Sequence, residues 1–464
     1  MTTNKRRTTT TCLPWILFAV LLAGCGRKAV QLDQGWSSPV KVTDSKDSLV
    51  GGVQLYKWGR TIIALKGLDD GTARCFAMNN EGDNGSWTEV QLTGVPRGYL
   101  WAYPAIDEDK VVFEEGYMEG DQLVMNAFVG RMAGKINVER ITERRWVTDK
   151  KSLFGETASN VRLNEPGRRN WPQLGLGNIN GRDMYIPYCL EGRLITYRGK
   201  SMIVEQGPAN NGVFHSADSG MAWDMERISQ SYACLPSMSR TKGYYYSFAV
   251  SLPTGPGHVW ELWYARKSAT GNSWEAPKAV TKTFGRSALI WKYVSAAEDD
   301  TVHLCWLDSR HEKKRRNPVY PFRENYEVVY CQRKDSDTNW SKDVILSEGM
   351  LYSYSPTMSV EGEKVVVAWA GVPTAPDEHH EYAPNDIYYV TSTDGGKTWS
   401  RRLKLTDGAK AGITSGRPEV VLQNGVIHLF YIQGNLNLKQ ESPGLTKLNQ
   451  PPWPICYQRR NFPN

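Results

Sequence analysis

The sequence lacks the residue spacings that mark most metal and redox sites. None of its eight cysteines forms a Cys-x-x-Cys pair, which excludes a structural zinc site of that type and thioredoxin-like chemistry. The only histidine pair, His379 and His380 in "HHE", does not have the spacing of a zinc protease. We therefore expect a protein that works without a metal or any other cofactor.

The sequence also lacks a strong excess of either charge. Its 56 lysines and arginines stand against 49 aspartates and glutamates, which gives a formal net charge of +7. No nucleic-acid-binding motif is visible, so we expect no nucleic acid partner. The mild positive charge is compatible with an anionic polysaccharide.

A long apolar run is missing as well. The apolar stretch "LPWILFAVLLAG" is too short to cross a bilayer comfortably, and "NKRR" precedes it. "LAGC" closes the stretch and resembles a bacterial lipobox, which implies cleavage before Cys25 and lipidation of its thiol. We predict a lipoprotein signal peptide over residues 1–24 and a mature chain over 25–464. An ordinary signal peptide or a short anchor is the alternative.

Export follows from each of these interpretations. The lipobox implies a membrane-anchored lipoprotein of the cell envelope, in the outer membrane or periplasm if the host is Gram-negative. Loss of the first 24 residues removes three cationic residues and no acid, which lowers the formal net charge to +4.

Six cysteines follow Cys25, and in an oxidising compartment some of them are candidates for pairing. They are Cys75, Cys189, Cys234, Cys305, Cys331 and Cys456. We place Cys305 and Cys331 on neighbouring strands, which makes them the first candidate for a disulfide. Two buried free thiols are the alternative.

The mature chain is built from a recurring unit. Each unit has a short strand, often with a proline, then a turn and a second apolar strand, as in "SPTMSVEGEKVVVAW" and "RPEVVLQNGVIHLFY". The prolines of these units recur about every 60 residues or at twice that interval, at Pro104, Pro172, Pro236, Pro356 and Pro418. Units of this size with alternating β-branched and aromatic residues are typical of four-stranded propeller blades.

We therefore predict an all-β fold, a single propeller domain of four-stranded antiparallel blades. Seven blades are expected, with six as the alternative. The last unit has no final strand led by tryptophan, whereas "GWSSPVKVT" at the mature N-terminus is such a strand without a unit. We expect this N-terminal strand to close the last blade. Three long segments are interpreted as insertions on one face, beginning at Gly192, Ser309 and Gly371.

The second half of several units carries a Ser-x-Asp-x-Gly-x-x-Trp box. Two complete boxes consist of Ser216, Asp218, Gly220 and Trp223, and of Ser392, Asp394, Gly396 and Trp399. The box resembles the Asp-box, or BNR repeat, of the sialidase-like β-propeller superfamily. In that family it lies opposite the active site. Serine, aspartate and glycine fit a hydrogen-bonded turn and the tryptophan a packing role, so we interpret the boxes as structural.

The functional site is then expected where first strands begin and second strands end. Aromatic residues that suit sugar stacking gather there, and the candidates for substrate binding are Trp101, Trp171, Tyr232, Trp291, Tyr354 and Tyr382. Packing within and between blades is the alternative role for each ring.

Charged candidates complete the predicted site. Arg417 begins a first strand, as a member of a sialidase arginine triad does, with Arg169 and Arg286 as companions. The Phe/Tyr-Arg-Ile-Pro signature of sialidases is absent from the first blade, which disfavours a true exo-sialidase.

"WLDSR" places Asp308, Arg310 and His311 at the mouth. These three residues are candidates for catalysis, and an ion-pair network of Asp308 and Arg310 with Glu327 is the alternative. Arginine with histidine or tyrosine suits β-elimination from a uronic acid, and propellers of this kind include lyases that cleave ulvan, which the chain resembles in architecture.

Three functions stay open at this point. A glycoside hydrolase or polysaccharide lyase acting on carbohydrate at the central mouth comes first, a non-catalytic propeller that binds glycan or protein second, and an exo-sialidase third. We expect a monomer.

Overall fold

A computed structural model describes a large part of the chain, and all of the elements in that part are β-strands. The described residues are 33, 35–42, 49–58, 61–68, 73–79, 87–90, 105–107, 110–119, 122–133, 137–149, 161–162, 173–174, 178–180, 183–190, 193–198, 201–206, 210–217, 224–229, 233–251, 261–281, 292–309, 326–373, 385–408, 413–435 and 454–463. No helix among them is long and apolar enough to cross a membrane.

The strands pair in antiparallel sheets, mostly of four strands that are consecutive in the chain. The first two sheets consist of β2 (Leu49–Trp58), β3 (Thr61–Leu68), β4 (Ala73–Asn79) and β5 (Thr88–Val90), and of β6 (Ala105–Asp107), β7 (Lys110–Glu119), β8 (Gln122–Ala133) and β9 (Asn137–Asp149). A five-stranded sheet follows with β11 (Gln173–Leu174), β12 (Asn178–Asn180), β13 (Asp183–Leu190), β16 (Asn210–Ser216) and β17 (Asp224–Ser229).

Three further four-stranded sheets contain most of the described side chains. They consist of β18 (Ala233–Arg240), β19 (Tyr244–Ser251), β20 (Glu261–Ser268) and β21 (Lys278–Ala279), of β22 (Tyr293–Glu298), β23 (Thr301–Asp308), β24 (Glu327–Lys334) and β25 (Val344–Ile345), and of β26 (Tyr352–Glu361), β27 (Lys364–Val372), β28 (Asp386–Ser392) and β29 (Leu403–Lys404). The last sheet combines β30 (Ile413–Gln423), β31 (Val426–Asn435) and β32 (Ile455–Asn461) with β1 (Val40–Lys41).

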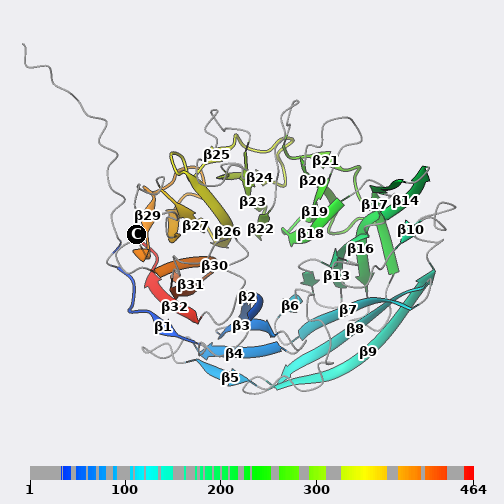
Figure 1. Ribbon diagram of the computed structural model, residues 1–464, viewed down its shortest axis with the longest axis horizontal. Helices are drawn as coiled ribbons and strands as arrows, with labels where there is room; N and C mark the ends of the chain where they lie inside the picture. Colours follow the sequence, from blue (N-terminus) through cyan, green and yellow to red (C-terminus); the bar gives the residue numbers. More distant parts are fainter. Residues whose placement is uncertain are drawn as a thin grey trace, which may run out of the picture.

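The sheets follow one another around a common centre in the order of the sequence (Figure 1). The first strand of each four-stranded sheet lies closest to that centre. These inner strands contact one another around the ring: β22 contacts β18 and β26, β30 contacts β26 and β2, and β6 contacts β2 and β12. The inner strands therefore form the wall of the centre.

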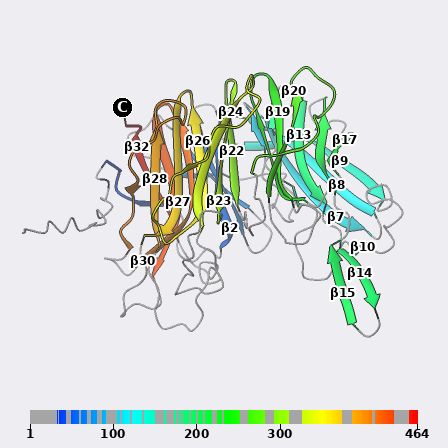
Figure 2. The same cartoon turned by 90° about the horizontal axis from the view of Figure 1, so that it is seen from above.

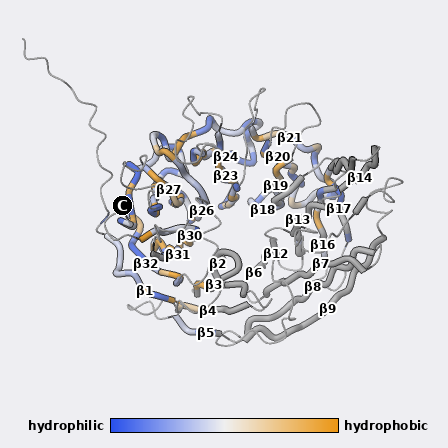
Figure 3. The backbone as a smooth tube through the Cα atoms, viewed as in Figure 1, coloured by the Kyte–Doolittle hydropathy of each residue, from blue (hydrophilic) through white to orange (hydrophobic). Residues whose placement is uncertain are grey.

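Burial explains why the strands form where the sequence pattern places them. Along β27 and β28 nearly every residue is buried, because these middle strands pack against neighbouring sheets on both faces. Figure 3 shows apolar residues along such strands. The outermost strands β21, β25 and β29 have two residues each, which keeps the exposed sheet edges short.

The N-terminal strand pairs with the C-terminal strand of the chain. Val40 lies opposite Tyr457, and Lys41 opposite Cys456. β1 thereby becomes the outermost strand of the sheet that contains β30, β31 and β32. The two ends of the described chain thus share one sheet, as the tryptophan-led segment "GWSSPVKVT" predicted.

A separate three-stranded sheet stands outside the ring. It consists of β10 (Val161–Arg162), β14 (Arg193–Arg198) and β15 (Ser201–Gln206), and it projects from one face in the side view (Figure 2). Its hairpin is the insertion predicted after Gly192. The insertions predicted after Ser309 and Gly371 lie mostly outside the described residues.

Neighbouring sheets share a repeated aromatic contact. The tryptophan that precedes the outermost strand of one sheet meets, edge to face, a tyrosine in the third strand of the preceding sheet. The pairs and their ring-centroid distances are Trp340–Tyr264 at 5.4 Å, Trp399–Tyr330 at 4.7 Å, Trp36–Tyr389 at 5.3 Å and Trp87–Tyr457 at 5.3 Å. Trp36 thus occupies in the last sheet the place that Trp340, Trp399 and Trp87 have in three other sheets.

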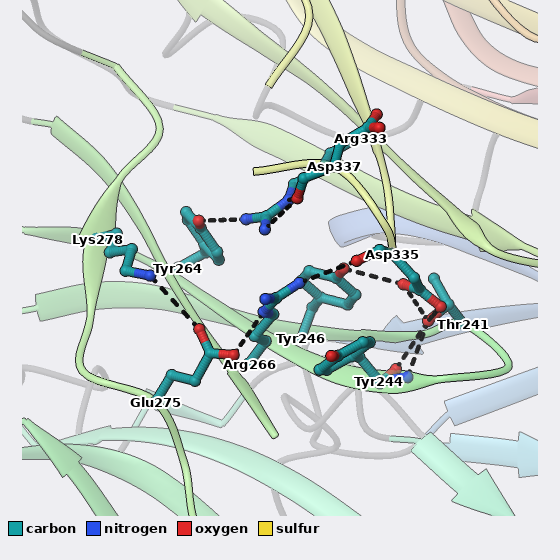
Figure 4. A network of polar contacts seen from close by, with 10 residues as sticks. All are labelled: Thr241, Tyr244, Tyr246, Tyr264, Arg266, Glu275, Lys278, Arg333, Asp335 and Asp337. Carbon is teal, nitrogen blue, oxygen red and sulfur yellow. Dashed lines mark hydrogen bonds and ion pairs between the residues drawn. The ribbon is translucent and has the colours of Figure 1, made fainter. Parts of the chain in front are cut away.

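The segment "DSDTNW", residues 335–340, keeps only the aspartate and the tryptophan of the box, and its aspartate links two sheets (Figure 4). Asp335, five residues before Trp340, accepts hydrogen bonds from Thr241 Oγ1 at 2.8 Å, from the backbone N–H of Gly243 at 3.1 Å and from the hydroxyl of Tyr246 at 3.0 Å. All three donors belong to the β18–β21 sheet or its first turn. An aspartate at the box position therefore fastens two sheets when it is not used to close its own turn.

The predicted disulfide between Cys305 and Cys331 does not form, and both thiols are buried. Cys305 lies opposite Tyr330, while Cys331 lies opposite Leu304. Side chains alternate between the faces of a sheet, so this one-residue offset sends the two thiols to opposite faces. They accordingly belong to different core clusters.

A buried histidine makes stability depend on pH. His303 is 2% exposed and its Nδ1 lies 2.7 Å from the hydroxyl of Tyr330, and burial lowers its pKa to about 4. The unfolded chain takes up this proton near pH 6.5, so the free energy of unfolding falls as the pH drops from there towards 4. Between pH 7 and pH 4.5 the free energy of unfolding should fall by about 2–3 kcal/mol less in His303→Asn than in the wild type. Urea unfolding of both proteins at the two pH values measures it, and equal losses would contradict the assignment.

Candidate functional site

The inner strands β26 and β30 are interrupted at equivalent points. Pairing with the next strand shifts register between Tyr354 and Thr357 in β26 and between Gly416 and Glu419 in β30. Each is therefore a β-bulge, a device that re-aims side chains and is common beside active sites.

Both bulges hold a strained residue directly before a proline. Ser355 and Arg417 have φ angles of 50° and 48°, in the left-handed region, and Pro356 and Pro418 follow them. A residue before proline normally adopts extended backbone, and a non-glycine residue at positive φ costs about 1–3 kcal/mol. Arg417 lies within β30, four residues after Ile413. The sequence pattern predicts it at the start of a first strand.

Arg417 presents a guanidinium that is partly withdrawn from water. Burial lowers its pKa, and the negative charge of an ionised Tyr354 would offset part of this shift. The two side chains are thus neighbours across β26 and β30. A partly desolvated guanidinium binds a carboxylate more strongly than an exposed one does, because water competes less.

Glu419 and Lys292 form a charged pair on this wall. Lys292 Nζ lies 3.8 Å from Glu419 Oε1, and the side chains keep 38% and 28% of their surface exposed. Thr357 Oγ1 donates a hydrogen bond of 3.1 Å to Glu419 Oε2. Lys292 directly precedes β22, so three neighbouring inner strands contribute to the cluster.

The environment of Glu419 suits proton transfer. Burial raises the pKa of this carboxyl, while Lys292 and the hydrogen bond from Thr357 lower it. A carboxylate whose pKa is raised is a stronger base than an unperturbed one.

Ser355 and Arg417 occupy equivalent positions in neighbouring sheets. Each lies in the bulge of its strand, six residues before the residue that closes the first hairpin, namely Glu361 and Gln423. Lys292 precedes β22, which pairs with β23 without a bulge. Lys292 and Glu419 were not among the predicted site residues, although the Arg-Pro-Glu sequence around Pro418 marks the position of Glu419.

Two predicted site residues have structural roles instead. Asp308 is fully buried, and its Oδ2 accepts a hydrogen bond of 2.8 Å from the indole Nε1 of Trp306. A carboxylate enclosed in this way does not reach a substrate. Tyr354 is 4% exposed and packs against Tyr352 at 5.5 Å, so its ring offers no open face for a sugar.

The remaining predicted site residues lie outside the described residues. They are Arg310 and His311 among the catalytic candidates, Trp101, Trp171, Tyr232, Trp291 and Tyr382 among the aromatic ones, Cys25 as the lipidation site, and Asp218, Gly220 and Trp223 of the first box. These residues stay predictions. Ser216, the remaining member of that box, is described and buried.

The second Asp-box forms a closed turn. Asp394 Oδ1 accepts bonds from Ser392 Oγ at 2.7 Å and from the backbone N–H of Thr398 at 2.9 Å, and the bonds from Thr398 lower the pKa of Asp394 to about 2. Gly396 has φ 88°, and a Cβ there would lie 1.9 Å from the hydroxyl of Tyr330. The box therefore locks its own turn and, through Trp399, joins the neighbouring sheet.

This box lies away from the charged wall. Val365 pairs with Ser392 at one end of the sheet, and Gly371 pairs with Asp386 at the other. Arg417 and Glu419 belong to an inner strand, whereas the box follows the third strand of its sheet. Within the described ranges no three of His, Cys, Asp and Glu gather as metal ligands.

Comparisons with known proteins identify the fold. No protein-family model and no curated protein matches the sequence. A solved structure of a PL25 polysaccharide lyase, an ulvan lyase with -[GlcA(1-4)Rha3S]- bound, has a TM-score of 0.51 and 8% identity over 86% of this chain and 94% of its own. The NanB sialidase from Streptococcus pneumoniae has a TM-score of 0.40 and 10% identity over 93% of this chain and 71% of its own. At 8% identity the likeness to the lyase concerns the fold alone, which is a β-propeller.

Proposed function

We propose that this protein is an exported, lipid-anchored polysaccharide lyase that cleaves a uronate-containing polysaccharide by β-elimination. Its scaffold is a seven-bladed propeller closed by the N-terminal strand, and the reaction takes place at the inner wall of the ring. The observation that carries the proposal is the contact of Lys292 with Glu419 in the inner wall, with the partly buried Arg417 two residues before Glu419 in β30.

Each charged group has one task in this reaction. Arg417 neutralises the substrate carboxylate and so lowers the pKa of the proton on C5. Glu419 takes that proton, the electron pair forms the C4=C5 double bond, and the C4–O4 bond breaks. Lys292 gives a proton to the leaving oxygen. The proton on Glu419 then returns to Lys292 across the 3.8 Å contact, which restores both groups.

The fold and the charge of the chain support the same substrate class. The PL25 lyase, with a similar fold, was solved with a glucuronate-containing ligand. The net positive charge of the chain favours an anionic polymer over a neutral one.

Turnover on a panel of acidic and neutral polysaccharides tests the proposal. With one uronate polymer, the ultraviolet absorbance of the unsaturated uronate and new reducing ends should appear together. Glu419→Gln should lower kcat/KM by about a thousandfold, because it removes the general base. Glu363→Gln, on the exposed turn between β26 and β27, is the matched control and should retain full activity.

Other outcomes distinguish the alternatives. Reducing ends without the absorbance would mean that the protein is a hydrolase. Glycan binding without turnover on any polymer would mean a binding propeller and would overturn the proposed lyase.

A further inference from the structure

Thr357 is held on both sides at the point where two bulged strands meet. Its Oγ1 donates to Glu419 Oε2 at 3.1 Å and accepts from the backbone N–H of Val420 at 3.3 Å. The side chain is 3% exposed. Because the N–H of Val420 occupies an acceptor position of the hydroxyl, the hydroxyl proton is directed at the carboxylate.

The bulges make this contact available. The register shift in β26 lies between Tyr354 and Thr357, and the shift in β30 lies between Gly416 and Glu419. Each shift adds one residue to its strand and so changes the face on which the following side chains lie. A second hydroxyl of β26, Ser359 Oγ, accepts a bond of 2.9 Å from the backbone N–H of Leu422, and no charged group of the described residues contacts it. Thr357 and Ser359 thus both join β26 to β30 through a backbone N–H, but only Thr357 also binds the carboxylate of Glu419.

We propose that Thr357 is the positioning residue of the site, which fixes the carboxylate of Glu419 and thereby sets the pH range in which the site works. The proposal rests on the proposed function, because it takes Glu419 as the general base. Thr357 occupies Oε2, so Oε1 is the oxygen left facing Lys292 and the substrate.

The direction of the effect follows from the charge of Glu419. A hydrogen bond to the ionised form favours that form, so Thr357 lowers the pKa that burial raises. Lys292 is the charged group of the described residues that faces Glu419, and it acts in the same direction. Loss of the threonine hydroxyl therefore leaves more of the carboxyl protonated at a given pH. Because a base must be ionised to act, a variant without this hydroxyl would lose activity at a higher pH than the wild type does as the pH falls.

Three variants separate a positioning role from a structural one. In Thr357→Val the acid limb of the pH profile of kcat/KM should move up by roughly one pH unit, the size expected for a hydrogen bond to a charged group. Thr357→Ser should restore the wild-type limb, because it keeps the hydroxyl. Ser359→Ala is the matched control, and it should lower the melting temperature without moving the limb.

A titration of Glu419 gives a readout without turnover. The carboxyl carbon is followed by NMR in protein labelled at glutamate, and the Glu419→Gln spectrum assigns its resonance. We expect the titration midpoint to rise in Thr357→Val and to return in Thr357→Ser. An unchanged midpoint in folded Thr357→Val would overturn the role of Thr357, even if the lyase activity holds. A shifted midpoint in a protein that cleaves no polymer would support the effect of Thr357 on Glu419 and contradict the proposed lyase activity.

Discussion

Replacement of Arg417 by glycine should remove turnover of the uronate polymer without destabilising the fold. Arg417 has φ 48°, which glycine adopts without steric cost. Relief of about 1–3 kcal/mol of strain offsets the entropy that glycine gains in the unfolded chain, roughly 0.5–1 kcal/mol. The loss of the guanidinium removes the group that stabilises the charge developing on the substrate, so kcat/KM should fall about 100- to 1,000-fold. Steady-state kinetics and thermal unfolding measure the two effects.

Ser355→Gly is the matched control for this variant. Ser355 has the same left-handed backbone, the same following proline and the equivalent position in the neighbouring sheet, but no charge. It should leave the thermal stability unchanged, and kcat/KM should stay within a few fold of the wild type. Full turnover in Arg417→Gly would exclude Arg417 from the reaction, and failure of that variant to fold would mean that the arginine is structural.

The repeat pattern explains how much of the fold could be predicted. Pro356 and Pro418 mark the bulges of inner strands, and Trp399 and Trp36 precede outermost strands. These features are local, so a single sequence displays them. β32 is less visible, because "ICYQRRN" is followed by no box and its outer neighbour β1 comes from the other end of the chain.

The site depends on contacts that local patterns do not contain. Lys292 and Glu419 lie 127 positions apart, and they meet because β22 and β30 both pack against β26. Asp308 was chosen because of its place at the mouth, but its burial behind Trp306 is a property of packing. The proposed pairing of Cys305 with Cys331 failed for a related reason, because strand register decides the face on which a side chain lies.

The N-terminal segment that carries Trp36 fastens the last two sheets to each other. The indole Nε1 of Trp36 donates to the hydroxyl of Tyr389 at 3.2 Å, and Arg460 contacts both Asp33 and Tyr389. The backbone N–H of Ser37 donates to the carbonyl of Arg459 at 2.8 Å. Residues 33 and 35–42, here called the clasp, therefore cover the outer edge of β32 and fill the space against the neighbouring sheet.

Removal of the clasp should destabilise the whole ring. A mature chain that begins at Thr43 loses the burial of Trp36, worth about 3 kcal/mol, and several hydrogen bonds of about 1 kcal/mol each. The sum is comparable to the whole stability of many domains, about 5–15 kcal/mol, and the uncovered edge of β32 becomes a template for aggregation. We expect the melting temperature to fall by at least about 10 °C, with light scattering on heating.

A chain that begins at Asp33 is the control, because it loses the same anchor segment but keeps the clasp. It should melt with the full mature protein, and Trp36→Ala within it should reproduce a large part of the loss. Ser38→Ala, at an exposed position of the same segment, should have no effect. Equal melting temperatures for the chains that begin at Asp33 and at Thr43 would mean that the ring is held by its inner strands alone, and that pairing of β1 with β32 follows folding without stabilising it.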